Sequence, residues 1–283
     1  MSMKNQLKTA ILLALLTALL LWVGQLIGGY SGLVFAGFFA VLMNFGAFWF
    51  SDKIVLMMYR AKEVTEKDQP ILFKIVRDVT HKANTPMPKV YIIPSENANA
   101  FATGRSKNHA AVACTQGILN LLKEDELKGV IAHEVAHIQN KDILISTIAG
   151  TIAGVISYVA FMARWAAIFG GSRDDDRGGN IISLLLLAIV TPIVATLIQL
   201  AISRSREYLA DETGARIIRS PYGLASALEK LESDAKKHPM RFGNTSTAHL
   251  FITNPFRSGG FIKLFQTHPD MASRIKRLKN MKI

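Results

Sequence analysis

The sequence contains very little cysteine: Cys114 is the only one among 283 residues. This excludes an intramolecular disulfide and fits a reducing compartment such as the cytoplasm. Cys114 lies in an apolar, strand-like run, so we expect it to be a core residue rather than a ligand. Acidic residues are also scarce, with 21 Asp and Glu against 33 Lys and Arg, which gives a net charge of +12.

Charge is absent over a long N-terminal stretch. No charged residue occurs between Lys8 and Asp52, a gap far longer than the ~20 residues that one membrane-spanning helix needs. The glycine-rich residues 28–32 near its middle indicate a turn. We therefore predict two spans, near residues 9–27 and 32–50. A secretory signal peptide is the alternative for the first span, but an equally apolar second span follows at once.

Two further uncharged runs follow, between Asp142 and Arg164 and between Arg177 and Arg204. Each is long enough to cross a bilayer; the alternative is a pair of buried helices in a soluble protein. The four predicted spans carry no ionisable group between their boundary charges. Transporters and channels usually do, so this class of protein is disfavoured.

The basic residues predict the orientation of the chain. Lys4 and Lys8 precede the first span, and Lys53, Arg60 and Lys62 follow the second. The positive-inside rule therefore places both ends of this hairpin in the cytoplasm. After residue 203 the chain has 15 basic and 7 acidic residues, 15 − 7 = +8, which suits anionic lipid. These basic residues are scattered without an aromatic platform, so we expect no nucleic-acid partner.

One motif carries chemistry. Residues 131–137 read Ile-Ala-His-Glu-Val-Ala-His, an H-E-x-x-H pattern in a helix-compatible run. His133 and His137 are four residues apart and share a helix face, so both imidazoles can bind one zinc ion. Glu134 is then placed to take a proton from a water that the metal activates. The alternative, three polar residues on a helix by coincidence, is a poor explanation of this spacing.

A catalytic zinc site needs a third protein ligand. Glu207 and Asp211 follow the fourth uncharged run and share a helix face. Glu207 can complete a His2Glu site, and Asp211 can accept a hydrogen bond from a ligand histidine. A solvated acidic pair is the alternative. The histidine motif and the Glu207 motif each lie within roughly 10 Å of a predicted span along their helices. The two motifs therefore meet only if the third and fourth uncharged runs both cross the membrane or neither does.

The remaining segments predict a mixed α and β architecture. Leu72, Ile75, Val76 and Val79 follow helical spacing, and a further helix is expected to start near residue 124 and to run on towards the third span. Short strands are expected at residues 89–93, 98–103 and 110–114, and two more helices around residues 224–231 and after Pro269. We divide the chain into an N-terminal hairpin (1–50), a first soluble piece (51–142), a second hairpin (143–203) and a second soluble piece (204–283).

These motifs together resemble the HtpX family of membrane-embedded zinc metallopeptidases, gluzincins related to the CAAX prenyl endopeptidases. The resemblance covers essentially the whole chain, including residues 99–104 and Thr267-His268-Pro269 with Arg274. It implies a multi-pass α-helical membrane protein with about four transmembrane helices, a zincin-like α+β peptidase domain and a small β-sheet. It also implies one Zn²⁺ per chain and a bacterial inner-membrane endopeptidase that removes misfolded or damaged membrane proteins.

The resemblance further implies a substrate-binding edge strand. Asn99, Ala100, Phe101 and Ala102 would pair with the substrate backbone, and His268 is a candidate for the substrate pocket or for a helix cap. Arg204 or His268 could also assist at the scissile carbonyl. The alternative function is a zinc-stabilised membrane scaffold, but such a site would normally use four protein ligands and would have no use for Glu134.

Overall fold

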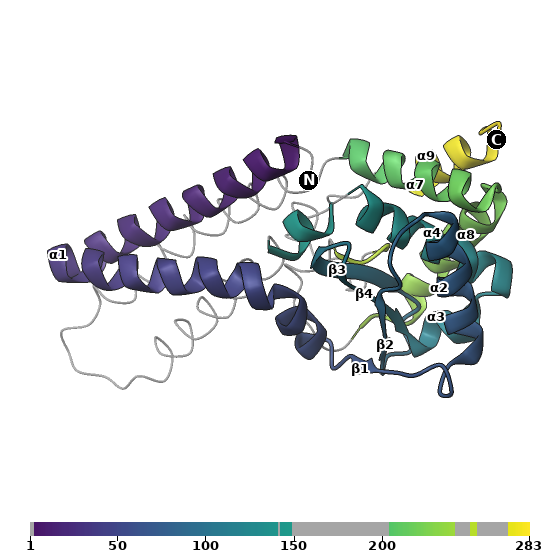
Figure 1. The fold of residues 1–283 in the computed structure, drawn as a ribbon, viewed down its shortest axis with the longest axis horizontal. Coiled ribbons are helices and arrows are strands. Elements are labelled where there is room, and N and C mark those ends of the chain that lie inside the picture. Colours follow the sequence, from purple (N-terminus) through teal and green to yellow (C-terminus); the bar gives the residue numbers. More distant parts are fainter. Residues whose placement is uncertain (1–2, 141, 149–203, 241–249, 254–270) are drawn as a thin grey trace.

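The computed structural model describes residues 3–140, 142–148, 204–240, 250–253 and 271–283. Most of the predicted third span, the predicted fourth span and His268 lie outside these ranges. A helical hairpin extends from one side of a mixed α and β domain (Figure 1). Within the described ranges, no helix meets the length and hydropathy required to cross a membrane.

The hairpin is α1 (Met3–Met58), two helical arms joined at a break. Gly29 adopts φ 57° and ψ −138° at this break, a conformation that glycine reaches without the steric cost of a Cβ. The turn falls within the glycine-rich residues 28–32, as predicted. A Cβ placed on Gly37 in the second arm would lie 3.6 Å from the Leu21 side chain in the first, so the arms pack against each other.

A four-stranded mixed sheet lies at the base of the hairpin (Figure 1). Its strands are β1 (Lys62–Glu63), β2 (Lys89–Ile93), β3 (Ala100–Ser106) and β4 (His109–Thr115), in the order β1-β2-β4-β3. β2 and β4 are parallel and the other pairs are antiparallel. β3 is therefore an edge strand, and it begins two residues later than predicted and extends to Ser106.

Six further helices of the described chain belong to this domain: α2 (Pro70–Lys82), α3 (Gln116–Leu121), α4 (Glu124–Gln139), α7 (Arg204–Ile218), α8 (Tyr222–Lys237) and α9 (Met271–Lys279). α2 buries the apolar stripe that its sequence predicted. α3 was not predicted; it begins where the Thr115 hydroxyl accepts a hydrogen bond from the Ile118 backbone N–H at 3.2 Å. Helix α8 buries Leu224, Leu228 and Leu231, as their spacing predicted.

Helix α4 is the centre of the domain and packs against α2, α7, α8 and β3. It starts at a turn in which Glu126 accepts a hydrogen bond from the Lys123 backbone at 2.8 Å, a local cap for the first turn. Ser226 and Lys230 of α8 also donate to the Glu126 carboxylate, each at 2.7 Å. These bonds anchor the helix that carries the H-E-x-x-H motif.

The helix expected to start near residue 124 and to run on towards the third span is present as α4, which stops just before that span. Helix α4 ends at Gln139, and the described chain becomes helical again only at residues 143–148. The break brings Asp142 back towards the last turn of α4, where its backbone N–H donates to the carbonyl of His137 at 3.0 Å. Cys114, by contrast, is a buried core residue as expected.

Candidate metal centre

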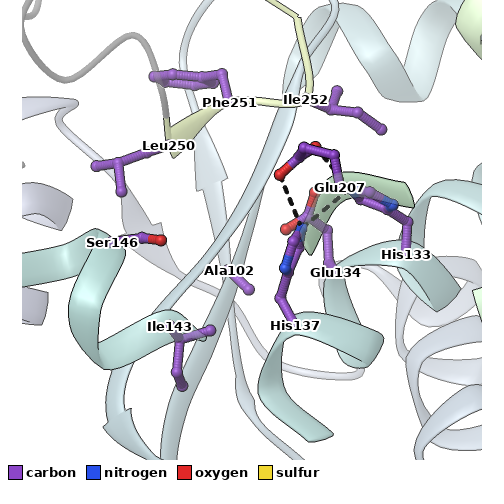
Figure 2. A pocket seen from close by; sticks show the side chains of 10 residues that line it. All are labelled: Ala102, His133, Glu134, His137, Ile143, Ser146, Glu207, Leu250, Phe251 and Ile252. Atoms are coloured by element: carbon purple, nitrogen blue, oxygen red, sulfur yellow. Dashed lines mark hydrogen bonds and ion pairs between the residues drawn. The ribbon is translucent and has the colours of Figure 1, made fainter. Parts of the chain in front are cut away.

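The motif residues of α4 point into a pocket at the edge of the sheet. Figure 2 shows His133, Glu134 and His137 of α4 converging with Glu207 of α7 at one end of this pocket. His133 and Glu134 are buried, with exposed fractions of 1% and 3%. Polar groups at such depth are costly unless they have partners, so the partners of each group indicate what the site can do.

Helix α7 approaches α4 closely enough to bring its acids to the histidines. A Cβ placed on Gly214 would lie 2.9 Å from the backbone of Ala132 and His133, closer than real Cβ contacts. A side chain at this position would therefore push the two helices apart. The close approach places Glu207 and Asp211, two and one turns before Gly214, beside the histidine pair.

The three predicted ligands lie at distances that fit a metal ion. The Nε2 atoms of His133 and His137 are 3.2 Å apart. Carboxylate oxygens of Glu207 lie 3.7 Å from Nε2 of His133 and 3.5 Å from Nε2 of His137. Ligand atoms bonded tetrahedrally to zinc are about 3.3 Å apart. Two imidazole nitrogens and one carboxylate therefore fit the donor set and size of a zinc site.

The outer nitrogen of His133 is held by Asp211. Its Nδ1 lies 2.9 Å from Asp211 Oδ1, the contact that the sequence predicted. Arg274 of α9 donates to the same carboxylate from Nε at 2.9 Å and from Nη2 at 2.7 Å. Burial raises the pKa of Asp211, but the charge and hydrogen bonds of Arg274 and His133 outweigh it and lower that pKa to about 2. Asp211 is therefore a carboxylate that orients the ring of His133.

His137 has a corresponding partner that the sequence reading did not identify. Its Nδ1 lies 3.4 Å from Oδ2 of Asp142, three residues after the end of α4. Burial lowers the pKa of His137, but Asp142 and the charges of Glu207 and Glu134 outweigh this effect and raise it to about 9. This cluster of negative charge favours a cation at the imidazole, whether a proton or a metal ion.

Glu134 lies beside the histidines, and the Ala102 backbone N–H of β3 donates to its carboxylate. Burial, together with the charge of Glu207, raises the pKa of Glu134, although His133, His137 and the Ala102 bond act in the opposite direction. A carboxylate whose pKa lies above its usual range is a better proton acceptor near neutral pH. The position fits the proton-transfer role predicted for Glu134.

The pocket wall opposite the metal ligands is apolar except for Ser146. It is lined by Ala102 of β3, by Ile143 and Ser146 after α4, and by Leu250, Phe251 and Ile252 (Figure 2). The last three come from a segment far from the motifs in sequence. Its Ile252 N–H donates to the carbonyl of Ala100 at 3.2 Å, so this segment lies along the start of β3.

The four edge-strand residues occupy different environments. Ala102 lines the pocket. Phe101 is buried in a second core cluster against Tyr59 and Phe251. The Asn99 amide nitrogen donates to the Thr253 carbonyl at 2.7 Å. Ala100 receives the Ile252 bond described above. The structure therefore places only Ala102 of this group beside the metal ligands.

The remaining candidates are placed less fully. Arg204 begins α7, but its side chain is outside the described part of the chain, as is all of His268. The sequence reading treated Arg274 only as part of a matching motif, yet this fully buried side chain contacts Asp211, and its Nη1 lies 3.6 Å from Glu207. The signal available in the sequence was helical spacing, because Arg274 shares a helix face with the apolar residues Met271 and Leu278.

Comparison with known proteins agrees with this geometry. The profile of peptidase family M48 matches residues 66–282. A "Protease HtpX homolog" of Syntrophobacter fumaroxidans is 51% identical over 282 residues, which cover 99% of this chain and 100% of that protein. Proteins with the same description are 53% identical in Desulforapulum autotrophicum, over 98% of this chain and 90% of the relative, and 52% identical in Pyrococcus furiosus, over 97% and 95%.

Among solved structures, the crystal structure of S. mikatae Ste24p superposes with a TM-score of 0.48 at 18% identity, covering 85% of this chain and 57% of that one. The alignments with the sequence relatives cover nearly the full length of this chain and of each relative. The motif residues converge on one site of a size that fits a metal ion. The chain therefore belongs to peptidase family M48, as a metallopeptidase homologous to HtpX.

Proposed function

We propose that this protein is a zinc-dependent endopeptidase of the plasma membrane that hydrolyses misfolded or damaged membrane proteins in quality control. The observation that carries the proposal is the convergence of His133, His137 and Glu207 with Glu134 in one pocket beside a sheet edge. A purely structural metal site offers no reason to keep a buried carboxylate beside its ligands.

His133, His137 and Glu207 are the residues that would hold the ion, with one zinc ion per chain. A bound zinc ion supplies Lewis acidity, which lowers the pKa of water and polarises a peptide carbonyl. Glu134 accepts the proton of the attacking water and later delivers it to the amine that leaves. The Ala102 N–H that donates to Glu134 holds this carboxylate at the edge of β3.

The substrate backbone would pair with β3 next to Ala102. At the start of β3, Ala100 and the preceding Asn99 are already hydrogen-bonded to Ile252 and Thr253. The part of the strand edge that we propose for the substrate therefore starts at Ala102, beside Glu134. Backbone pairing at a sheet edge is insensitive to sequence, which suits an enzyme that acts on many unfolded chains. The apolar wall of Leu250 and Ile252 favours an apolar substrate side chain near the scissile bond.

The proposed chemistry is tested by zinc analysis and cleavage of casein by purified protein, for wild type and Glu134→Gln. The variant should retain zinc and lose activity, because Glu134 is a base and not a ligand. Glu124→Gln is the matched control, since it changes an exposed glutamate at the start of the same helix. Substantial cleavage by zinc-loaded Glu134→Gln would overturn the assignment.

The membrane location rests on the sequence rather than on a span in the described structure. The uncharged run between Lys8 and Asp52 is long enough for two spans, and α1 exposes large apolar side chains, including Tyr30, Phe35 and Phe38. The lysines that flank this hairpin favour a cytoplasmic active site. The partners we propose are accordingly the lipid bilayer and membrane-protein substrates.

Cysteine labelling in a Cys114→Ser background tests this topology. A cysteine at Ser172, between the predicted third and fourth spans, should react with an impermeant reagent added to intact cells. A cysteine at Ser233, on an exposed position of α8, should react only after lysis. Labelling of both positions in intact cells, or of neither, would contradict the arrangement in which these spans return the chain to the cytoplasm.

A further inference from the structure

The two ligand histidines have parallel surroundings. Each presents Nε2 to the metal position and Nδ1 to an aspartate: His133 to Asp211 at 2.9 Å, and His137 to Asp142 at 3.4 Å. Both aspartates are buried. A carboxylate behind a ligand histidine fixes which ring nitrogen carries the proton and directs the lone pair of the other at the metal.

The parallel extends to a second layer of residues, because each aspartate forms an ion pair with an arginine. Behind Asp211 is Arg274, described above. Behind Asp142 is Arg206, the residue before Glu207 on α7, whose Nη1 lies 3.9 Å from Asp142 Oδ1. The Arg206 side chain is only 11% exposed. All three of its guanidinium nitrogens are buried and form no hydrogen bond with the described residues.

Burying a guanidinium with so few partners is expensive. Two carboxylates offset part of this cost: Asp142, whose Oδ1 lies 3.9 Å from Nη1 of Arg206, and Glu207, the next residue on α7. One of these carboxylates is a metal ligand and the other holds a metal ligand. Arg206 therefore connects Asp142, which holds His137, to Glu207, the third predicted metal ligand and the next residue on α7.

We propose that Asp142 and Arg206 form a second positioning pair for the metal site, in which Asp142 accepts the Nδ1–H of His137 and Arg206 holds the Asp142 carboxylate in place. Neither residue is placed to touch the substrate. The inference rests on the metal site of the proposed function, but not on its substrates or its membrane location.

Zinc affinity of the full-length protein, purified in detergent and measured by competition with a chelator, tests the pair without any substrate. Asp142→Asn should weaken zinc binding by about 10–100-fold, as the loss of a carboxylate behind a ligand histidine tends to do. Asp125→Asn is the control, since this exposed aspartate lies at the opposite end of α4. Its zinc affinity should equal that of wild type.

Arg206→Met gives the sharper test, because two explanations predict opposite signs. If Arg206 acts only as a positive charge near a cation site, its removal should tighten zinc binding. If it holds Asp142 in place, its removal should weaken zinc binding about threefold or more, while Arg206→Lys should restore most of the loss. Arg216→Met, which changes an exposed arginine on the same helix, should have no effect.

A double-mutant cycle completes the experiment. Because Arg206 is argued to act through Asp142, the double variant Asp142→Asn, Arg206→Met should bind zinc no more weakly than Asp142→Asn alone. The proposal is overturned if Asp142→Asn binds zinc like wild type, if Arg206→Met tightens binding, or if the two losses add. A failure of casein cleavage with these affinities as predicted would count against the proposed function and leave the positioning pair intact.

Discussion

Helices α1 and α4 differ in which side chains they expose and which they bury. On α1, the large apolar side chains of Tyr30, Phe35 and Phe38 are 79%, 72% and 66% exposed. On α4, His133 and Glu134 are almost completely buried. One helix presents apolar surface outward, and the other encloses charge at the centre of the domain.

The two helices are stabilised by different means. The described outward side chains of α1 are mostly large and apolar, and exposed apolar surface on this scale marks an interaction site, in agreement with the bilayer contact we propose. The buried groups of α4 are instead matched one by one, His133 by Asp211 and His137 by Asp142. Changes in α4 should therefore be specific and large, whereas changes in α1 should depend mainly on hydrophobicity.

The largest expected effect is loss of the metal. Glu207→Ala should abolish stable zinc binding, because only two histidines then remain as ligands in the described site. Metal analysis after dialysis checks this. Glu212→Ala, which removes an exposed glutamate on the same helix, should keep one zinc per chain; equal zinc content in the two variants would remove Glu207 from the site.

A smaller but still large effect is expected at Arg274. Arg274→Met leaves Asp211 and Glu207 buried without their cation, which should lower the free energy of unfolding by about 3–5 kcal/mol. Denaturant unfolding of the zinc-free protein measures it. The control is Lys276→Met on an exposed position of α9, expected within about 0.5 kcal/mol of wild type. Similar values for both would show that α4 does not depend on matched charges.

Glycine substitutions compare the two helices directly. A Cβ on Gly129 of α4 would lie 2.4 Å from the Leu224 backbone nitrogen, whereas one on Gly46 of α1 would meet no described atom within 4 Å. Gly129→Ala should lower the free energy of unfolding by about 1–3 kcal/mol through overpacking. Gly46→Ala should not lower it. A tolerated alanine at position 129 would mean that α4 and α8 pack less tightly than the structure shows.

A further expected effect is a pH dependence of the zinc-free protein. The folded-state pKa of His137, about 9, lies above its ordinary value of 6.5. The stability that protonated His137 contributes is therefore fully present below pH 6.5 and is lost as the pH rises through 9. Unfolding measured from pH 6 to 10 should show this loss in wild type and in the exposed control His81→Gln, but not in His137→Gln.

Local patterns explain what the sequence predicted well. His133 and His137, like Glu207 and Asp211, are related by one helical turn, and this spacing is visible without a structure. The leucines of α8 follow the same rule. The Gly29 turn and strands β2 and β4 were also recognisable, because a glycine cluster, the β-rich run of β2 and the apolar run of β4 beside turn-forming residues are local signals.

The contacts that the sequence did not predict join distant parts of the chain. Arg274 meets Asp211 across 63 residues, and Thr253 meets Asn99 across 154. No periodicity relates such pairs. Asp142 is close to His137 in sequence, but its role depends on the end of α4 at Gln139 and on the return of the chain towards His137, which the helical spacing of the motif does not predict.

The separation of the ligands along the chain has a consequence for biosynthesis. Glu207 follows His137 by 207 − 137 = 70 residues, and at ~5–20 residues per second a ribosome adds it roughly 4–14 s later. During this interval the nascent chain has both histidines but lacks the third ligand. Arg274 is added 67 residues later still, 274 − 207 = 67. The order of translation therefore keeps each new molecule inert until most of its chain has been made.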